Sequence, residues 1–186
     1  MQLVVLGLNH KTVSVDIREQ FAISEESARS GLRHLDEQEG IEEAVVLSTC
    51  NRTEIYAVLK NGAARKTLYQ FFLTLSGNSE AKKEYFFYFE GEACIRHLFE
   101  VASGLDSMVI GESQILNQIK TAYTMALSEK ATKTILNTLF HRAITTGKRV
   151  RTETRISYSA VSVSYAAVKL AEKILGGLDD RTGMVF

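Results

Sequence analysis

The sequence predicts an α+β fold, in which a ferredoxin-like split βαβ domain is followed by a helical part. The first observation is the order of elements over residues 1–90, which reads strand, helix, strand, strand, helix, strand. The second is the change after Gly91, where apolar residues recur at helical spacing. The third is composition, because 186 residues that are 45% apolar can build a sizeable core.

Four runs supply the strands of the predicted sheet. Residues 3–8 form a short apolar run suited to a buried strand. Residues 45–49 and 54–59 are rich in β-branched and aromatic residues, and residues 85–89 form a compact aromatic run. The split βαβ pattern does not require the two middle strands to be neighbours in the sheet. The connection that contains Cys50 can therefore be either a tight hairpin or a loop at the end of the sheet.

Two helices are predicted between these strands. The first starts at Ser24, a suitable N-cap followed by acidic residues, and runs to about Glu39, with Gly40 as its stop. The second runs from about Ala63 to Leu75. Both carry apolar residues at helical spacing.

Four further helices are predicted in the second half of the chain, over residues 92–102, 115–128, 134–151 and 161–174. Between the first two, residues 104–114 interrupt the helical pattern and gather acidic, hydroxyl and amide groups between glycines. Such a segment is typical of a tight helix corner or of a polar binding wall.

The end of the helix predicted over residues 134–151 has a basic face. It carries Lys148, Arg149 and Arg151, with Arg155 just beyond. Basic runs are more often solvated helix faces than nucleic-acid sites, and this one is also a candidate phosphate-binding stripe.

The connection around Cys50 is chemically the richest part of the sequence. Ser48 and Thr49 precede the thiol, and Asn51 and Arg52 follow it. A cysteine at a strand end with donors beside it fits a nucleophile whose thiolate is favoured by a nearby positive charge. The same residues also fit a half-buried cysteine beside a salt-bridged arginine. The residue types alone leave both interpretations open.

Composition narrows the function classes. Lys and Arg balance Asp and Glu at 22 each, so no overall charge indicates a nucleic-acid or membrane partner. No apolar stretch approaches the roughly 20 residues needed to cross a bilayer, and two cysteines with four scattered histidines offer no zinc-ligand spacing. We therefore expect no membrane segment and no metal site. The few cysteines and the absence of a basic leader predict a reducing cytoplasm.

Three longer motifs occur in order along the chain: residues 7–12 (GLNHKT), residues 48–56 (STCNRTEIY) and residues 104–116 (GLDSMVIGESQIL). Together with residues 149–154 (RVRTET) and the helix that contains residues 159–167, they resemble glutamyl-tRNA reductase, and the resemblance spans the whole chain. It implies NADPH-dependent reduction of glutamyl-tRNA to glutamate-1-semialdehyde through a cysteine thioester, the first step of five-carbon tetrapyrrole (heme and porphyrin) biosynthesis.

The resemblance also implies a domain organisation. Residues 1–155 would be the catalytic domain, with a ferredoxin-like part over about 1–90 and a helical part over about 91–155. Residues 156–177 would be a connecting spinal helix, and residues 178–186 the start of an NADPH-binding domain. The chain has no Gly-x-Gly-x-x-Gly fingerprint, so we expect NADPH to be bound by a domain that this chain lacks. The partners implied are glutamyl-tRNA, a second subunit held through an absent C-terminal domain, and a downstream aminomutase.

The resemblance assigns roles to particular residues. Cys50 would be the nucleophile, and His97 would favour its thiolate or assist proton transfer. Without the resemblance, His97 fits a hydrogen-bonded histidine beside a helix core. Arg52 would bind the side-chain carboxylate of the glutamyl group. The full set implied for substrate binding is Thr49, Asn51, Arg52, Ser107, Glu112 and Gln114. The set implied for further pocket or tRNA contacts is His10, Arg149, Arg151 and Ser159. Asn9 and His10 rank lower because they also fit residues that hold the loop, and Ser159 and Ser162 also fit small packing residues.

A second function class stays open. The same fold could serve as a tRNA-binding or regulatory module without chemistry, and replacement of Cys50 by serine distinguishes the two, because only an enzyme would lose acyl transfer. A generic cysteine hydrolase is disfavoured, since the sequence has no nearby histidine motif oriented by Asp or Asn.

Overall fold

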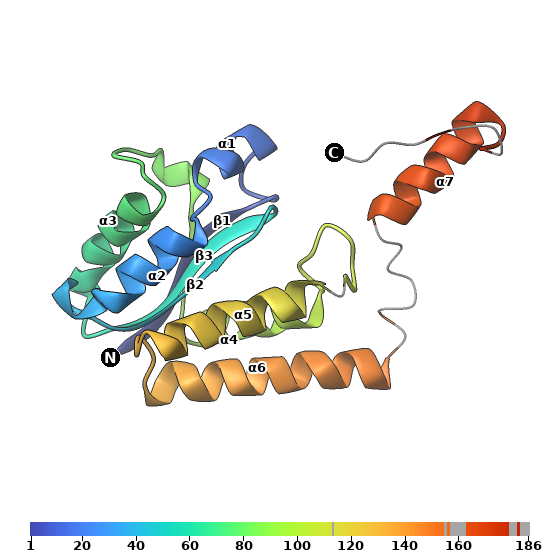
Figure 1. Cartoon of the computed structure of the whole chain (residues 1–186). Coiled ribbons are helices and arrows are strands. Elements are labelled where there is room, and N and C mark those ends of the chain that lie inside the picture. Colours follow the sequence, from blue (N-terminus) through green and yellow to red (C-terminus); the bar gives the residue numbers. More distant parts are fainter. Residues whose placement is uncertain (113, 155, 157–162, 179–181, 183–186) are drawn as a thin grey trace.

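The computed structural model describes residues 1–112, 114–154, 156, 163–178 and 182. Figure 1 shows a β-sheet between two groups of helices. The strands are β1 (Gln2–Asn9), β2 (Ile41–Ser48), β3 (Arg52–Leu59) and β4 (Phe87–Glu90). The α-helices are α1 (Val15–Gln20), α2 (Glu25–Arg33), α3 (Arg65–Leu75), α4 (Gly91–Ser103), α5 (Gln114–Ser128), α6 (Thr134–Glu153) and α7 (Val163–Leu175), and short 3₁₀ turns lie at η1 (Leu35–Glu37), η2 (Gly62–Ala64) and η3 (Lys83–Tyr85).

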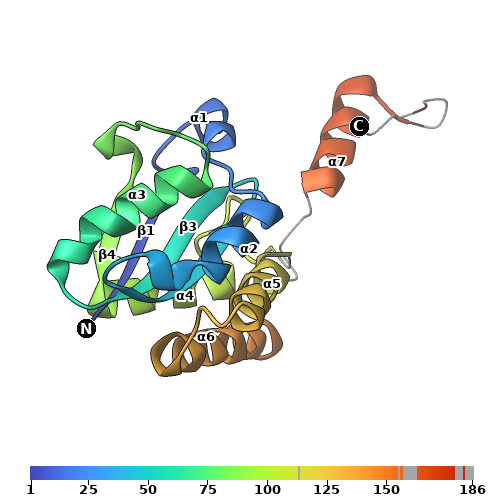
Figure 2. The same ribbon diagram turned by 60° about the vertical axis from the view of Figure 1, so that its left-hand side comes forward.

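The sheet has the strand order β2-β3-β1-β4, and each neighbouring pair is antiparallel. Helices α2 and α3 lie on one face, and α4, α5 and α6 lie on the other (Figures 1 and 2). This arrangement confirms the predicted α+β class with a split βαβ sheet. Strands β1, β2 and β3 are buried along nearly their whole length, since helices cover both faces.

The connection around Cys50 is a tight hairpin and not an open loop. Strands β2 and β3 are neighbours, Ser48 pairs with Thr53, and the Thr49 backbone N–H donates to the Arg52 carbonyl at 2.8 Å. The turn contains no residue with positive φ, so it does not need the Asn-Gly or Asp-Gly pair of common hairpins. The Thr49 hydroxyl oxygen instead accepts hydrogen bonds from the backbone N–H groups of Asn51 and Arg52, both at 3.2 Å.

The region before β2 differs from the prediction in two places. Ser24 caps α2 as expected, because its hydroxyl oxygen accepts from the Ser27 backbone N–H. The helix ends at Arg33 and not at about Glu39, since the chain tightens into the 3₁₀ turn that buries Leu35. Helix α1 was not predicted, and its six residues include none that is buried, so it leaves no apolar periodicity to detect.

Strand β4 shows how the sheet divides its side chains between two environments. The rings of Phe87 and Phe89 lie 5.0 and 5.3 Å from the ring of His97 on α4. Phe86, one residue earlier, instead contacts the rings of Tyr69 and Phe72 on α3. Successive residues of a strand point to opposite faces, so one aromatic strand contributes to both helical layers.

Helix α7 lies apart from the other helices in both views (Figures 1 and 2). It begins and ends within two residues of the predicted 161–174. Ser159, Ser162, Arg155 and the strand start expected at residues 184–186 lie outside the described residues. The predicted domain boundaries therefore stay predictions. Among the residues that the structure describes, no helix combines the length and the apolar character needed to cross a membrane.

Candidate functional site

Cys50 lies at the tip of the β2-β3 hairpin, with its thiol free and its residue exposed. Contacts from the N-terminal segment hold the backbone of this tip. The His10 backbone N–H donates to the Asn51 carbonyl at 3.1 Å, and Arg18 Nε donates to the Cys50 carbonyl at 3.3 Å. Arg18 also donates from Nη1 to the Val13 carbonyl, which fastens α1 to the same place. The thiol is thus presented on a turn that is bonded from both sides.

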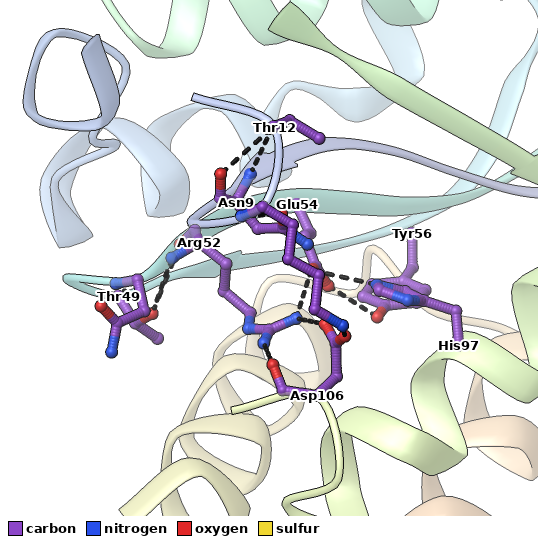
Figure 3. Close-up of polar contacts among 10 residues, drawn as sticks. Asn9, Thr12, Thr49, Arg52, Glu54, Tyr56, His97 and Asp106 are labelled. Atoms are coloured by element: carbon purple, nitrogen blue, oxygen red, sulfur yellow. Dashed lines mark hydrogen bonds and ion pairs between the residues drawn. The ribbon is translucent and has the colours of Figure 1, made fainter. Parts of the chain in front are cut away.

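Arg52 directs its side chain away from the tip and into the protein. Its side chain is 1% exposed, Nη1 donates to Glu54 Oε1 at 2.8 Å and to Asp106 Oδ2 at 2.9 Å, and Nη2 donates to the Asp106 carbonyl at 2.5 Å. Lys11 pairs with the other carboxylate oxygen of Asp106. Figure 3 shows Arg52 reaching from the hairpin toward Asp106. These contacts join the hairpin, the end of β1 and the segment after α4.

Glu54 is the centre of a buried polar network behind the hairpin. Its side chain is fully buried, Oε1 faces His97 Nε2 at 3.1 Å, and Oε2 accepts from the Tyr56 hydroxyl at 2.7 Å (Figure 3). Gly7 of β1 makes room for it, because a Cβ on Gly7 would lie 2.8 Å from Glu54 Cγ and 2.8 Å from the Thr53 carbonyl oxygen. A side chain at position 7 would press on Glu54, whose carboxylate bonds to His97.

Burial and charge act in opposite directions on the two carboxylates of the network. Burial alone would raise the pKa of Glu54, but the charge of Arg52 and the hydrogen bonds from His97 and Tyr56 outweigh it and hold that pKa below its ordinary value. Asp106 follows the same pattern, since Lys11 and Arg52 outweigh burial and lower its pKa. Both groups are therefore carboxylates at neutral pH, as buried ion pairs require.

His97 is held by a residue close to Cys50 in the chain. Its Nε2 bonds to Glu54, which lies four positions from Cys50, with Arg52 between them. The rings of Phe87 and Phe89 hold the imidazole of His97 from the other side. His97 is thus fixed by its surroundings, and no described hydrogen bond joins it to the thiol.

His10 is a histidine whose backbone hydrogen bonds directly to the hairpin tip, at Asn51. Burial first, and then the charge of Arg52, lowers its pKa, so the ring is neutral at neutral pH. Its Nδ1 is buried and has no hydrogen-bond partner among the described residues. A neutral imidazole with an unused nitrogen can accept a proton.

Two hollows lie near the buried network and β2, and Cys50 lines neither of them. The first, of about 440 Å³, is lined by His97 and Asp106 together with Asn9, Lys11 and Thr12 at the end of β1. The second, of about 380 Å³, lies where β2 meets α2 and α5, and its lining includes Ser48 and Gln114. Each hollow therefore contains a residue that the sequence singled out, His97 in one and Gln114 in the other.

The remaining predicted residues that the structure describes line neither hollow. Ser107 and Glu112 are half-buried in the segment between α4 and α5, and the Glu112 carbonyl accepts from Arg151 Nη2 at 2.9 Å. Arg151 thereby ties α6 to that segment. Arg149 is exposed and pairs with Glu153 one turn along α6.

Sequence reasoning missed five residues of this network and the hairpin support: Lys11, Arg18, Glu54, Tyr56 and Asp106. Alternation along β3 was a usable signal for two of them, because Arg52, Glu54 and Tyr56 share one face of a strand. No local signal pairs Asp106 with Arg52, since 54 positions separate them. Among the described residues, no group of three or more His, Cys, Asp or Glu side chains is arranged to hold a metal ion.

The fold and the hairpin define a class first: a ferredoxin-like α+β domain that presents an exposed cysteine in front of a buried ion-pair network. Comparison with known proteins then identifies the family. Residues 6–154 match the family model for the N-terminal domain of glutamyl-tRNA(Glu) reductase, and the chain belongs to this family.

Named relatives agree with this assignment. The chain is 51% identical over 189 residues to a glutamyl-tRNA reductase of Geobacter metallireducens, and 48% identical over 184 residues to one of Trichlorobacter lovleyi. These matches cover 100% and 98% of this chain but 43% and 42% of the relatives, so the chain spans less than half of their length. The structure of a glutamyl-tRNA reductase from Methanopyrus kandleri superposes with a TM-score of 0.72 at 37% identity, over 92% of this chain and 39% of that one.

Proposed function

We propose that this chain takes the glutamyl group of glutamyl-tRNA onto Cys50 as a thioester, which is the acyl-transfer half of the glutamyl-tRNA reductase reaction. The observation that carries the proposal is the exposed, free thiol of Cys50 on a hairpin turn whose backbone is bonded by Thr49, His10 and Arg18. A nucleophile must reach a bulky substrate without losing its orientation, and a short turn supported from both sides meets both needs.

The step is an exchange of esters. The Cys50 thiolate attacks the carbonyl carbon that links glutamate to the terminal ribose of the tRNA, so an S–C bond forms and the ribose C–O bond breaks. The thiol proton is taken up by a base, and the departing ribose oxygen receives one proton. We assign that proton to the neutral ring of His10, whose backbone N–H donates to Asn51 at the tip. Freed tRNA and a glutamyl thioester on Cys50 are the products.

We assign the glutamyl group to the 440 Å³ hollow that His97 and Asp106 line. The hollow is lined by His97 and by polar side chains at the end of β1, and a pocket of this size holds a small amino acid. His97, oriented by Glu54, would donate to or accept from the bound group there, in keeping with the role implied by the resemblance. Ser107 would contact the substrate from the segment between α4 and α5, whereas Gln114, at the start of α5, lines the second hollow and would contact a part of the substrate that extends there.

Arg52 is 1% exposed and directs three of its five N–H donors to Glu54 and Asp106, so we propose that the glutamyl carboxylate reaches it by displacing one of these partners. Its Nη1 hydrogens are directed to Glu54 and to Asp106. Since Glu54 is fully buried and Asp106 belongs to a segment between helices, Asp106 is the carboxylate that the substrate would replace. In the absence of substrate, Asp106 would therefore occupy the position on Arg52 that the glutamyl carboxylate is proposed to take.

The described residues do not fit the cofactor of the complete reaction. Reduction of the thioester needs a hydride donor, which the resemblance gives as NADPH, but the sheet is antiparallel and the sequence has no Gly-x-Gly-x-x-Gly loop. The thiol also has to stay reduced, so the activity belongs in a reducing compartment such as the cytoplasm. Dimerisation and transfer of the product to an aminomutase stay predictions of the resemblance.

The test is to mix this chain with glutamyl-tRNA, quench with acid and search the Cys50 peptide for a glutamyl adduct by mass spectrometry. We expect an adduct that hydroxylamine removes and that is absent with Cys50→Ala. The Cys94→Ala variant is the matched control, because Cys94 is buried in α4 and carries no proposed role. Tight tRNA binding without an adduct, unaltered by Cys50→Ser, would instead identify a tRNA-binding module without chemistry.

A further inference from the structure

A basic and aromatic cavity lies on the opposite face of the sheet from His97. It measures about 480 Å³ and lies between α3, η2 and β4. Its cationic rim is formed by Arg65, Lys66 and Lys83, and its other lining residues are Leu6, Gly62, Ala63, Tyr69, Phe86 and Tyr88. We refer to it as the α3 cavity.

The α3 cavity is separate from the hairpin site. It reaches Gly62, which follows the end of β3, whereas Cys50 precedes the start of β3. An eight-residue strand spans about 25 Å. Phe86 and Tyr88 point to the α3 side, whereas Phe87 and Phe89 point to the side of His97. A ligand in the α3 cavity would therefore bind independently of the proposed acyl transfer.

The cations of the α3 cavity are not neutralised by carboxylates of the described residues. Arg65, Lys66 and Lys83 are exposed and form no ion pair with the described residues, although other exposed cations on this surface, such as Lys60 with Glu42, do pair. Three unpaired positive charges around one hollow favour a ligand that carries at least one strong negative charge. A phosphate group, with several acceptor oxygens, uses such a set more fully than a single carboxylate.

The aromatic part of the cavity adds a preference for a flat group. The guanidinium of Arg65 lies 3.8 Å from the centre of the Tyr88 ring, so the two are stacked. Arg65 is an exposed residue, and arginine can stack on aromatic groups through both faces, so its guanidinium can carry a further planar ring. Phe86 and Tyr69 close the apolar floor behind it.

Tyr88 contributes a buried hydroxyl to the α3 cavity, beside the carboxylate of Glu90. Burial, and then the charge of Glu90, raises the pKa of this hydroxyl to about 12, so it stays protonated and can donate. A ligand acceptor in the cavity would compete with Glu90 for this donor.

We propose that the α3 cavity binds a phosphorylated nucleoside, with its base on the Arg65–Tyr88 stack and its phosphate between Lys66 and Lys83. The ligand is either a free mononucleotide or a nucleotide within an RNA strand, since both present the same base and phosphate. The volume of the cavity suits one nucleotide.

The test measures binding of adenosine monophosphate to this chain by calorimetry, with adenosine and inorganic phosphate as partial ligands. We expect saturable binding of the nucleotide and binding weaker by about tenfold or more for each partial ligand. Inorganic phosphate that binds as tightly as the nucleotide would overturn the assignment, and so would the absence of saturable binding by both the nucleotide and RNA.

Variants locate the site. Lys66→Ala with Lys83→Ala should weaken binding by about tenfold or more, and Arg65→Lys should weaken it although it keeps the charge, because the flat stack is lost. Arg33→Ala is the control, since Arg33 is an exposed arginine on α2 away from the cavity. Equal affinity in all these variants would refute the site. A Cys50→Ser chain should bind the nucleotide normally, so failure here is distinguishable from failure of the acyl-transfer proposal.

Competition distinguishes the source of the nucleotide. A short single-stranded RNA that displaces adenosine monophosphate and loses affinity in the Lys66→Ala, Lys83→Ala chain would identify an RNA strand as the ligand. An RNA that does not compete would identify a free nucleotide.

Discussion

Arg52 Nη1 lies 2.9 Å from Asp106 Oδ2, and this ion pair joins the cysteine hairpin to the segment after α4. Both side chains are nearly buried, at 1% and 8% exposure. The pair matters in two ways, because it stabilises the fold and because it occupies the guanidinium that the glutamyl carboxylate is proposed to use.

Replacing Asp106 by asparagine should separate these two effects. The change leaves Arg52 with one buried carboxylate in place of two, so the free energy of unfolding should fall by about 2 to 4 kcal/mol, measured by urea denaturation. Glu25→Gln, which removes an exposed partner of Arg29, should change it by less than about 0.5 kcal/mol.

The same variant tests the exchange of partners at Arg52. With Asp106 neutral, glutamyl-tRNA should form the Cys50 adduct at least as fast as in the unmodified chain at a temperature where both are folded, whereas Arg52→Gln should slow it. If Asp106→Asn and Arg52→Gln slow adduct formation equally, Asp106 does not give way to the substrate.

Acid should destabilise the chain through Glu54. The pKa of Glu54 in the folded chain lies below its ordinary value of 4.5, so its contribution to stability is complete above that value and is lost as the pH falls through the folded-state pKa. The free energy of unfolding of the Glu54→Gln variant should be lower by about 3 kcal/mol near neutral pH. On acidification it should fall less than that of the unmodified chain. Urea denaturation across the acidic range measures this, and an unchanged pH slope in Glu54→Gln would contradict it.

Gly7→Ala should strain the buried network. The new Cβ would lie 2.8 Å from both Glu54 Cγ and the Thr53 carbonyl oxygen, so we expect a loss of about 1 to 3 kcal/mol in the free energy of unfolding. Gly62→Ala is the control, because the nearest atom to its Cβ would lie at 3.7 Å. The melting temperature of Gly7→Ala should lie clearly below that of Gly62→Ala. Equal melting temperatures would show that β1 and β3 can move apart at position 7 without loss of stability.

Thr49→Val should loosen the hairpin tip. It removes the hydroxyl oxygen that accepts two backbone N–H groups, which should reduce stability by about 1 kcal/mol and slow adduct formation at Cys50. Thr49→Ser keeps the hydroxyl and should keep both properties. The rate is read from rapid acid quench, and a Thr49→Val rate equal to that of the unmodified chain would show that the turn does not depend on this side chain.

Arg18→Ala should affect the reaction more than the fold. Arg18 is half-buried and donates to the Cys50 and Val13 carbonyls, so its loss frees the hairpin tip from α1. We expect adduct formation to slow by about tenfold, with a melting temperature close to that of the unmodified chain. Arg33→Ala should leave the rate of adduct formation unaltered. An equal decrease of the rate in Arg33→Ala would show that the effect comes from the loss of a positive charge and not from the lost contacts at the hairpin tip.

Most of the fold follows from patterns within short stretches of sequence. Apolar periodicity and turn residues located every strand and all helices except α1, because these signals depend on neighbours within a few positions. The helix after Ser24 was predicted too long, since the burial of Leu35 in a 3₁₀ turn depends on a tertiary contact. The choice between hairpin and loop at Cys50 likewise needed the sheet order.

The sequence by itself determined the α+β class, the reactive thiol between two strands and, through its motifs, the family. Only the tertiary structure decided what surrounds that thiol. Arg52 and Asp106 are 54 positions apart, and His97 and Glu54 are 43 apart, so no local rule relates their charges. Ion pairs and cavities form between elements that folding brings together, and for that reason the buried network and the α3 cavity are properties of the folded chain.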